Sequence, residues 1–198
     1  MKRVEVGKAK CFVICAPSGA GKTTLMNKII EGSRNIFYDS VSDTTRKMRS
    51  GEVDGKDYNF ISVPEFKSRL KNGEYLENAE VHGNYYGTRK APLFDAMDAG
   101  KSPFLVIDVQ GFSQLQKNIP EDKLCAIFIL PPNEEEIINR INKRDDMSEE
   151  DLKIRLKNSK KECAVAPEFR YCVTNDDLET TYSIMKFIIG KEMELKRY

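Results

Sequence analysis

The stretch APSGAGKTT, residues 16–24, carries residue types that can bind the phosphate chain of a nucleotide. It follows the pattern G-x-x-x-x-G-K-S/T, except that Ala16 stands at the first glycine position. In such a loop, called a P-loop, backbone N–H groups wrap the phosphates, the lysine reaches the β- and γ-phosphates, and the following hydroxyl ligates Mg²⁺. The pattern therefore predicts a nucleoside triphosphate site that comprises Ser18, Gly19, Ala20, Gly21, Lys22, Thr23 and Thr24.

Two arginines in the stretch SDTTRKMRSGE, residues 42–52, could hold a second phosphate group. Arg46 and Arg49 stand three positions apart, and their guanidinium groups could clamp a phosphate dianion through charge-assisted hydrogen bonds. The hydroxyl groups of Tyr58 and Tyr86 could add further donors.

Three further polar residues could distinguish one purine base from another. A carboxylate such as Glu77 could accept hydrogen bonds from guanine N1–H and N2–H₂, and the hydroxyls of Ser42 and Thr88 could donate to guanine O6. Adenine presents the reverse pattern of donors and acceptors at that edge, so this set would favour guanine.

The P-loop pattern alone indicates a nucleoside triphosphate and leaves the reaction open, because GTPases, ATPases, small-molecule kinases and nucleic-acid motors all use it. Residues 142–145 match N-K-x-D, a pattern that reads guanine in GTPases. In that class the pattern directly follows a buried strand, whereas here it ends a predicted helix. The GTPase interpretation is therefore disfavoured.

Short apolar runs alternate with helical patterns along most of the chain, which is typical of an α/β fold with a parallel sheet flanked by helices. The predicted strands cover residues 11–15, 104–107, 124–130 and 171–174. The predicted helices cover residues 23–32, 112–117, 133–143, 148–164 and 178–195.

Residues 42–89 have a different character, with glycine turns and short alternating runs that predict a small, mostly antiparallel β insert. One helix is predicted within it, at residues 64–71. We therefore expect a single domain with a core of residues 1–41 and 90–198, the insert at 42–89, and a polar, arginine-bearing lid at about 140–155.

Several motifs together resemble the guanylate kinase family over nearly the whole chain. They are APSGAGKTT, SDTTRKMRSGE, GKDYNF, GNYYGT, IDVQG and VTNDD, in the family's order and at similar spacing. The resemblance implies a P-loop NTPase-type core with a GMP-binding insert and a helical lid. It also implies in-line transfer of the γ-phosphoryl group of ATP to GMP with Mg²⁺, in purine nucleotide metabolism.

The resemblance assigns roles to individual residues. The phosphate of GMP would be held by Arg46, Arg49, Tyr58 and Tyr86, and its base would be read by Ser42, Glu77, Thr88 and Asp108. Arg140, Arg144 and Arg155 match lid arginines that close over the ATP phosphates, and Asn175 stands where the family approaches the adenine. The catalytic charges would then be Lys22, Arg46 and the lid arginines. Thr23 would ligate Mg²⁺ directly, and Asp108 would contact Mg²⁺ through a water molecule.

One position departs from the family. The family usually has D-x-D-x-Q-G after the insert, and here Val106 replaces the first acidic residue, which leaves Asp108 as the carboxylate near the metal. Inactive, protein-binding guanylate-kinase-like domains are therefore an alternative, although Lys22 and the clamp arginines argue for catalysis. A kinase for another nucleoside monophosphate is a second alternative, against which the predicted base readers argue.

The composition limits the partners. The 198 residues carry a formal net charge of +1, which gives no indication of a nucleic-acid or membrane surface. Five cysteines without a C-x-x-C pattern and a single histidine, His82, indicate reduced thiols and no metal cluster. We expect a cytoplasmic monomer or homodimer that binds GMP or dGMP and ATP.

Overall fold

The core is a parallel five-stranded sheet in a computed structural model that describes residues 9–17, 20–33, 35–81, 83–144 and 149–195. Neighbouring strands pair in parallel throughout, which confirms the predicted α/β class. In spatial order the strands are β2 (Phe37–Asp39), β7 (Ser102–Ile107), β1 (Cys11–Cys15), β8 (Leu124–Leu130) and β9 (Tyr171–Thr174).

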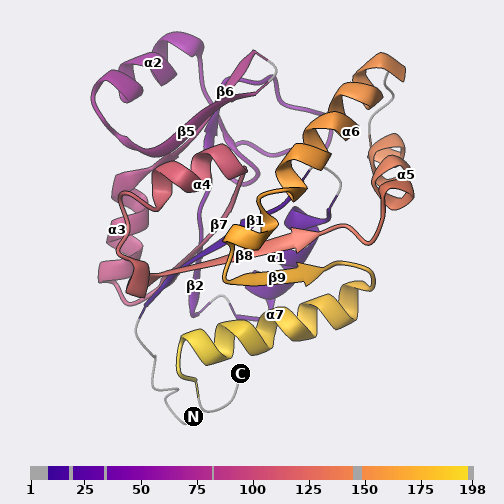
Figure 1. The fold of residues 1–198 in the computed structure, drawn as a ribbon. Helices are drawn as coiled ribbons and strands as arrows, with labels where there is room; N and C mark the ends of the chain where they lie inside the picture. Colours follow the sequence, from indigo (N-terminus) through magenta and orange to yellow (C-terminus); the bar gives the residue numbers. More distant parts are fainter. Residues whose placement is uncertain (1–8, 18–19, 34, 82, 145–148, 196–198) are drawn as a thin grey trace.

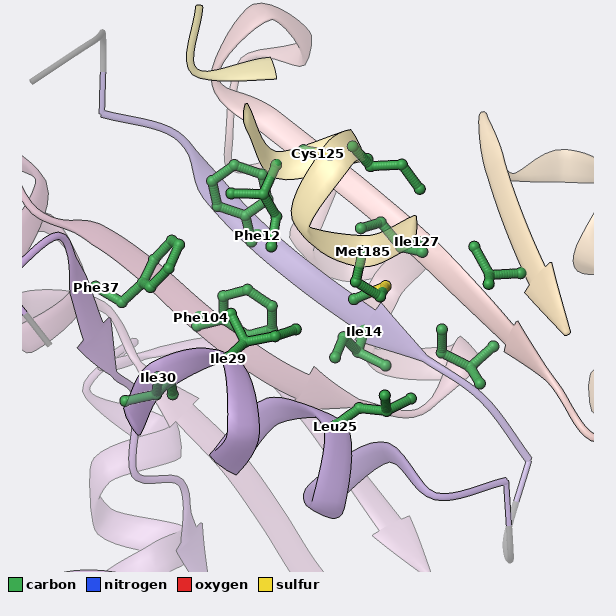
Figure 2. Close-up of a cluster of buried hydrophobic side chains, with 14 of the residues drawn as sticks. Phe12, Ile14, Leu25, Ile29, Ile30, Phe37, Phe104, Cys125, Ile127 and Met185 are labelled. Atoms are coloured by element: carbon green, nitrogen blue, oxygen red, sulfur yellow. The ribbon is translucent and has the colours of Figure 1, made fainter. Parts of the chain in front are cut away.

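Helices cover both faces of this core sheet because alternate residues of its strands are apolar on both sides. Phe12 and Ile14 pack toward α1 (Lys22–Glu31) and α7 (Leu178–Glu192). Figure 2 shows this layer, with side chains of α1 facing β1. The residues that alternate with Phe12 and Ile14 pack toward α3 (Lys90–Asp98) and α4 (Val109–Leu115).

The part of the chain predicted as a β insert forms a second, smaller sheet. Its order is β4 (Asn59–Phe60), β3 (Asp43–Thr44), β6 (Asn84–Arg89) and β5 (Tyr75–Val81). The pairings of β6 with β3 and with β5 are antiparallel, and that of β3 with β4 is parallel, so the prediction of a mostly antiparallel sheet is confirmed. The helix α2 (Val63–Lys71) packs on it through the buried Phe66.

Two helices, α5 (Glu134–Arg144) and α6 (Glu149–Cys163), contain the predicted lid. In Figure 1 they stand on the opposite side of the molecule from α2, β5 and β6. Two 3₁₀ turns, at Glu121–Lys123 and Ala166–Glu168, precede β8 and β9. None of the described helices is long and apolar enough to cross a membrane.

Two helix boundaries differ from the prediction by three residues. The helix predicted at residues 112–117 is α4, which begins at Val109 because the Asp108 side chain accepts a hydrogen bond from the Gly111 N–H, at 2.7 Å, and caps the helix. The terminal helix, predicted to reach residue 195, ends at Glu192.

Candidate active site

The carboxyl ends of three core strands bring together residues that are far apart in the sequence. Ala16 follows β1, Asp108 follows β7 and Asn175 follows β9. Strands that run in parallel end at the same edge of their sheet, which is where ligands bind in open α/β folds. The predicted P-loop, the Asp108 carboxylate and the Asn175 amide therefore share one edge of the core.

The backbone of the described part of the P-loop explains the residue types at Gly21 and Ala16. Gly21 caps α1 with φ 89°, in the left-handed region that favours glycine. Glu194 is the one non-glycine residue with positive φ in the described part of the chain, so Ala16 has a conformation that alanine adopts readily. This explains why alanine is tolerated at the first glycine position. Ser18 and Gly19, both predicted to bind ATP, lie outside the described residues.

The Lys22 ammonium lies at the base of the loop. Its Nζ donates to the backbone carbonyl of Ala16 and, at 3.1 Å, to that of Pro17. Both carbonyls belong to the loop itself, so the charge is held beside the position expected for the phosphates. Thr23 and Thr24 follow in the first turn of α1, and the side chain of Thr23 lies outside the description.

Three of the predicted base-reading residues form one polar row across the smaller sheet. Thr88 of β6 is directly opposite Glu77 of β5, and its Oγ1 donates to Glu77 Oε1 at 2.6 Å. The Ser42 hydroxyl, next to β3, lies 3.1 Å from the same Thr88 oxygen. Adjacent strands thus bring together residues that are distant in the sequence. Ser42 is 35 or more positions away from each of the other two residues.

Glu77 stands where the smaller sheet meets the core. Its side chain is 5% exposed, and burial raises the pKa of its carboxyl to about 7, while the hydrogen bond from Thr88 lowers that pKa and Asp108 raises it. A β-carbon built on Gly111 would collide with Glu77 Oε2, so glycine leaves room for this carboxylate in its present position. Asp108 and Glu77 are therefore neighbours across the junction, as their predicted common role requires.

The predicted phosphate clamp gathers around Arg46. Its guanidinium carbon lies 5.5 Å from the ring centre of Tyr58 and 5.6 Å from that of Phe60. Tyr58 in turn meets Tyr86 edge to face, with ring centres 5.9 Å apart. The structure brings together one arginine and both tyrosines of the predicted clamp.

Glu52 orders this clamp, and the sequence reasoning assigned it no role. It accepts two hydrogen bonds from Arg46, at 2.8 and 3.0 Å, and a third from the Arg49 backbone N–H at 2.7 Å. The hydrogen bonds to Glu52 raise the pKa of Arg46 above its ordinary value. Burial lowers this pKa, and Tyr86 raises it. The glutamate in the quoted motif SDTTRKMRSGE was the available signal, because a carboxylate next to two arginines can orient them.

Of the predicted lid arginines, Arg140 is the one whose side chain is described. Its Nε donates to Glu136 at 2.7 Å, and its NH2 donates to the backbone carbonyl of Asn175 at 3.3 Å. Arg144 and Arg155 lie in α5 and α6, and their side chains fall outside the description. The lid is thus connected to the strand edge through Arg140.

Glu162 is a second acidic residue that the sequence reasoning missed. It lies near the end of α6, where burial raises the pKa of its carboxyl, the charge of Lys22 lowers it and that of Asp108 raises it. Its carboxyl is therefore close enough to Lys22 and Asp108 for their charges to affect its pKa. The sequence offered no signal, because Glu162 is one of many charged residues in a polar helix.

The donors available for a metal are oxygen atoms. The Thr23 hydroxyl and the Asp108 carboxylate are hard ligands of the kind that Mg²⁺ prefers, and Mg²⁺ in kinases takes only one or two protein ligands beside phosphates and water. Among the described residues no cluster of three His, Cys, Asp or Glu side chains could hold a metal unaided. Val106 packs against the apolar layer under α1. The residues present fit Mg²⁺ bound together with a nucleotide.

Comparisons with known proteins agree with this geometry. The family model described as guanylate kinase matches residues 8–192. Guanylate kinases of Clostridium tetani and Chlamydia trachomatis are 42% and 44% identical to this chain, over 93% and 92% of its length and 87% and 88% of theirs. The crystal structure of guanylate kinase from Anaplasma phagocytophilum superposes with a TM-score of 0.78 at 33% identity, and the match covers 96% of this chain and 89% of that one.

Proposed function

Because the chain belongs to the guanylate kinase family and transfers a phosphoryl group from ATP to GMP, we propose that its smaller sheet holds GMP and its P-loop holds ATP. The row of Ser42, Thr88 and Glu77 carries this assignment, because its hydrogen bonds align a buried carboxylate with two hydroxyls. That combination matches the guanine edge. Asp108, on the core side of the junction, would be the remaining residue that recognises the guanine base.

The phosphate of GMP would lie in the clamp formed by Arg46, Arg49, Tyr58 and Tyr86. Glu52 keeps the Arg46 guanidinium at the clamp before the substrate arrives, so less side-chain freedom is lost on binding. The attacking group is a phosphate oxygen that is ionised near neutral pH, since the second pKa of a phosphate monoester is about 6. The reaction therefore needs alignment and charge neutralisation rather than a general base.

At the core edge the P-loop amides would hold the phosphates of ATP. Lys22 would exchange its bonds to loop carbonyls for bonds to the β- and γ-phosphates, and Arg140, Arg144 and Arg155 would neutralise charge from the lid side. Thr23 and, through water, Asp108 would hold Mg²⁺, which neutralises phosphate charge when it is bound. Closure of the lid would exclude water and so prevent hydrolysis of ATP. A cytoplasmic location, use of dGMP and a monomeric or homodimeric state stay predictions.

Replacing Glu77 with glutamine is expected to reduce the preference for GMP over AMP. The glutamine amide offers one acceptor and places a donor opposite the guanine N–H groups, so a charge-assisted hydrogen bond is lost, which corresponds to about 10- to 100-fold in the ratio of kcat/KM values. A coupled assay with GMP and AMP measures this ratio. Glu80→Gln, at an exposed position of β5, is the matched control. An unchanged ratio in Glu77→Gln would remove Glu77 from the base-reading set.

The affinity for GMP is expected to fall as the pH falls from about 8 to about 6. Because burial raises the pKa of Glu77 to about 7, its carboxyl takes up a proton within this range, and only the ionised form accepts both guanine N–H groups. Below this pKa the Kd should rise by about tenfold per pH unit. Calorimetric titration at several pH values measures the effect.

The control for this experiment is Glu77→Gln, which keeps the ionisation of the GMP phosphate and removes that of Glu77. Its Kd should depend on pH less steeply than that of the wild-type chain. Equal slopes in the two proteins would show that Glu77 does not titrate with GMP binding.

A further inference from the structure

Asn175 extends the pairing of β8 with β9 and directs its side chain into the P-loop. Asn175 directly follows the last paired residue of β9, and its backbone N–H donates to the carbonyl of Leu130, the last paired residue of β8, at 2.7 Å. Its side chain is buried, with the residue 4% exposed, and Nδ2 donates to the Ala20 carbonyl at 2.7 Å. The carbonyl can only accept, so the amide nitrogen must face it, and the orientation of this amide follows from the chemistry.

The contact leaves no space between the two segments. A β-carbon built on Gly21 would lie 2.5 Å from Asn175 Nδ2, a separation that carbon and nitrogen atoms do not tolerate. The absence of a side chain at Gly21 is therefore needed twice, once for its φ of 89° and once for the approach of Asn175.

The hydrogen bond to Ala20 fixes the direction of the peptide that joins Ala20 to Gly21. In a trans peptide the carbonyl and the following N–H point in opposite directions. Because Asn175 holds the Ala20 carbonyl, the Gly21 N–H points away from Asn175. In the proposed ATP site this N–H is one of those that bind a phosphate.

The same residue also connects to the lid. The Asn175 backbone carbonyl accepts a hydrogen bond from Arg140, whose Nε is held by Glu136. One residue at the end of β9 thus supports both the P-loop and a lid arginine through separate atoms.

We propose that Asn175 is a positioning residue for the triphosphate, acting through the P-loop backbone rather than through contact with the adenine base. The inference rests on the proposed ATP site. It differs from the role that the family resemblance implies, which places Asn175 beside the adenine. A contact with the base would affect the affinity for ATP alone. Support of the loop would affect the affinity for any ligand that carries the phosphate chain.

Titration calorimetry with two ligands, ATP and inorganic triphosphate, each with Mg²⁺, separates these roles. Asn175→Asp keeps the size of the side chain and replaces the donor with a carboxylate that repels the Ala20 carbonyl. We expect its affinity for both ligands to fall by the same factor, about tenfold or more, while the Kd for GMP stays at the wild-type value. Unchanged affinity for inorganic triphosphate, whether or not that for ATP falls, would overturn the proposal.

Two further variants keep this test interpretable. In Gly21→Ala the added methyl group would collide with the Asn175 amide, so this variant should also bind both ligands more weakly. It replaces the aspartate variant in the test if that variant does not fold. Thr174→Ser, at the exposed preceding position, should bind both ligands as the wild type does. Failure of the wild-type chain to bind either ligand would instead contradict the ATP site itself.

Discussion

Replacing Lys22 with alanine is expected to lower kcat by about 10²- to 10³-fold while GMP still binds with its wild-type Kd. A preorganised charge beside transferring phosphates contributes effects of this size to the transition state. Steady-state assays of ADP and GDP formation measure the loss, and calorimetry measures GMP binding.

Two observations make the Lys22 experiment specific. The apolar residues of α1 that pack on the sheet are unchanged in the variant, so its melting temperature should stay close to that of the wild type. Lys28→Ala, in the same helix, removes a surface ion pair with Glu179 and should leave kcat unchanged. Full activity in Lys22→Ala would reject the role of the P-loop lysine.

Replacing Arg46 with alanine is expected to raise the KM for GMP by about 10- to 100-fold and that for ATP by much less, since each hydrogen bond to a charged group contributes about 1.5–3 kcal/mol. Arg46 joins the two tyrosines and Glu52, so its loss also leaves the Glu52 carboxylate, with 19% of its side chain exposed, facing the incoming phosphate. Like charges at that position would weaken GMP binding further.

Initial rates at varied GMP and varied ATP separate the two KM values for Arg46→Ala. Lys47→Ala removes the exposed neighbouring charge and is the matched control. Arg46→Lys keeps the charge and loses the forked geometry, so its KM for GMP should lie between those of the wild type and the alanine variant. Equal increases in the two KM values would contradict the assignment of Arg46 to the GMP clamp.

Most of the core could be predicted because its strands are uninterrupted apolar runs and its helices have clear spacing. The run at residues 11–15 followed by the glycine-rich loop led directly to β1 and α1. One strand and one α-helix of the core were missed. The strand β2 has only three residues, too few for a periodic signal, and α3 begins without a side-chain cap, directly after β6.

The residue types of the site could be predicted, whereas the contacts between them could not. The row of Ser42, Thr88 and Glu77 depends on the register of β3, β6 and β5, which the sequence spacing does not reveal. Glu52 could have been found from its place beside two arginines in the motif. The surroundings of Glu162 depend on tertiary neighbours, because a single carboxylate in a polar helix carries no distinguishing pattern. Asn175 was expected beside the adenine from the family resemblance, and only the structure shows its bond to the P-loop.

Binding of a bisubstrate compound, adenosine and guanosine joined through five phosphates, tests most directly that two phosphate sites on separate sheets face each other across one active site. It should bind one molecule per chain and inhibit competitively against both ATP and GMP, because its two ends occupy both sites at once. Competition against only one of the two substrates, or binding of two molecules per chain, would contradict this arrangement.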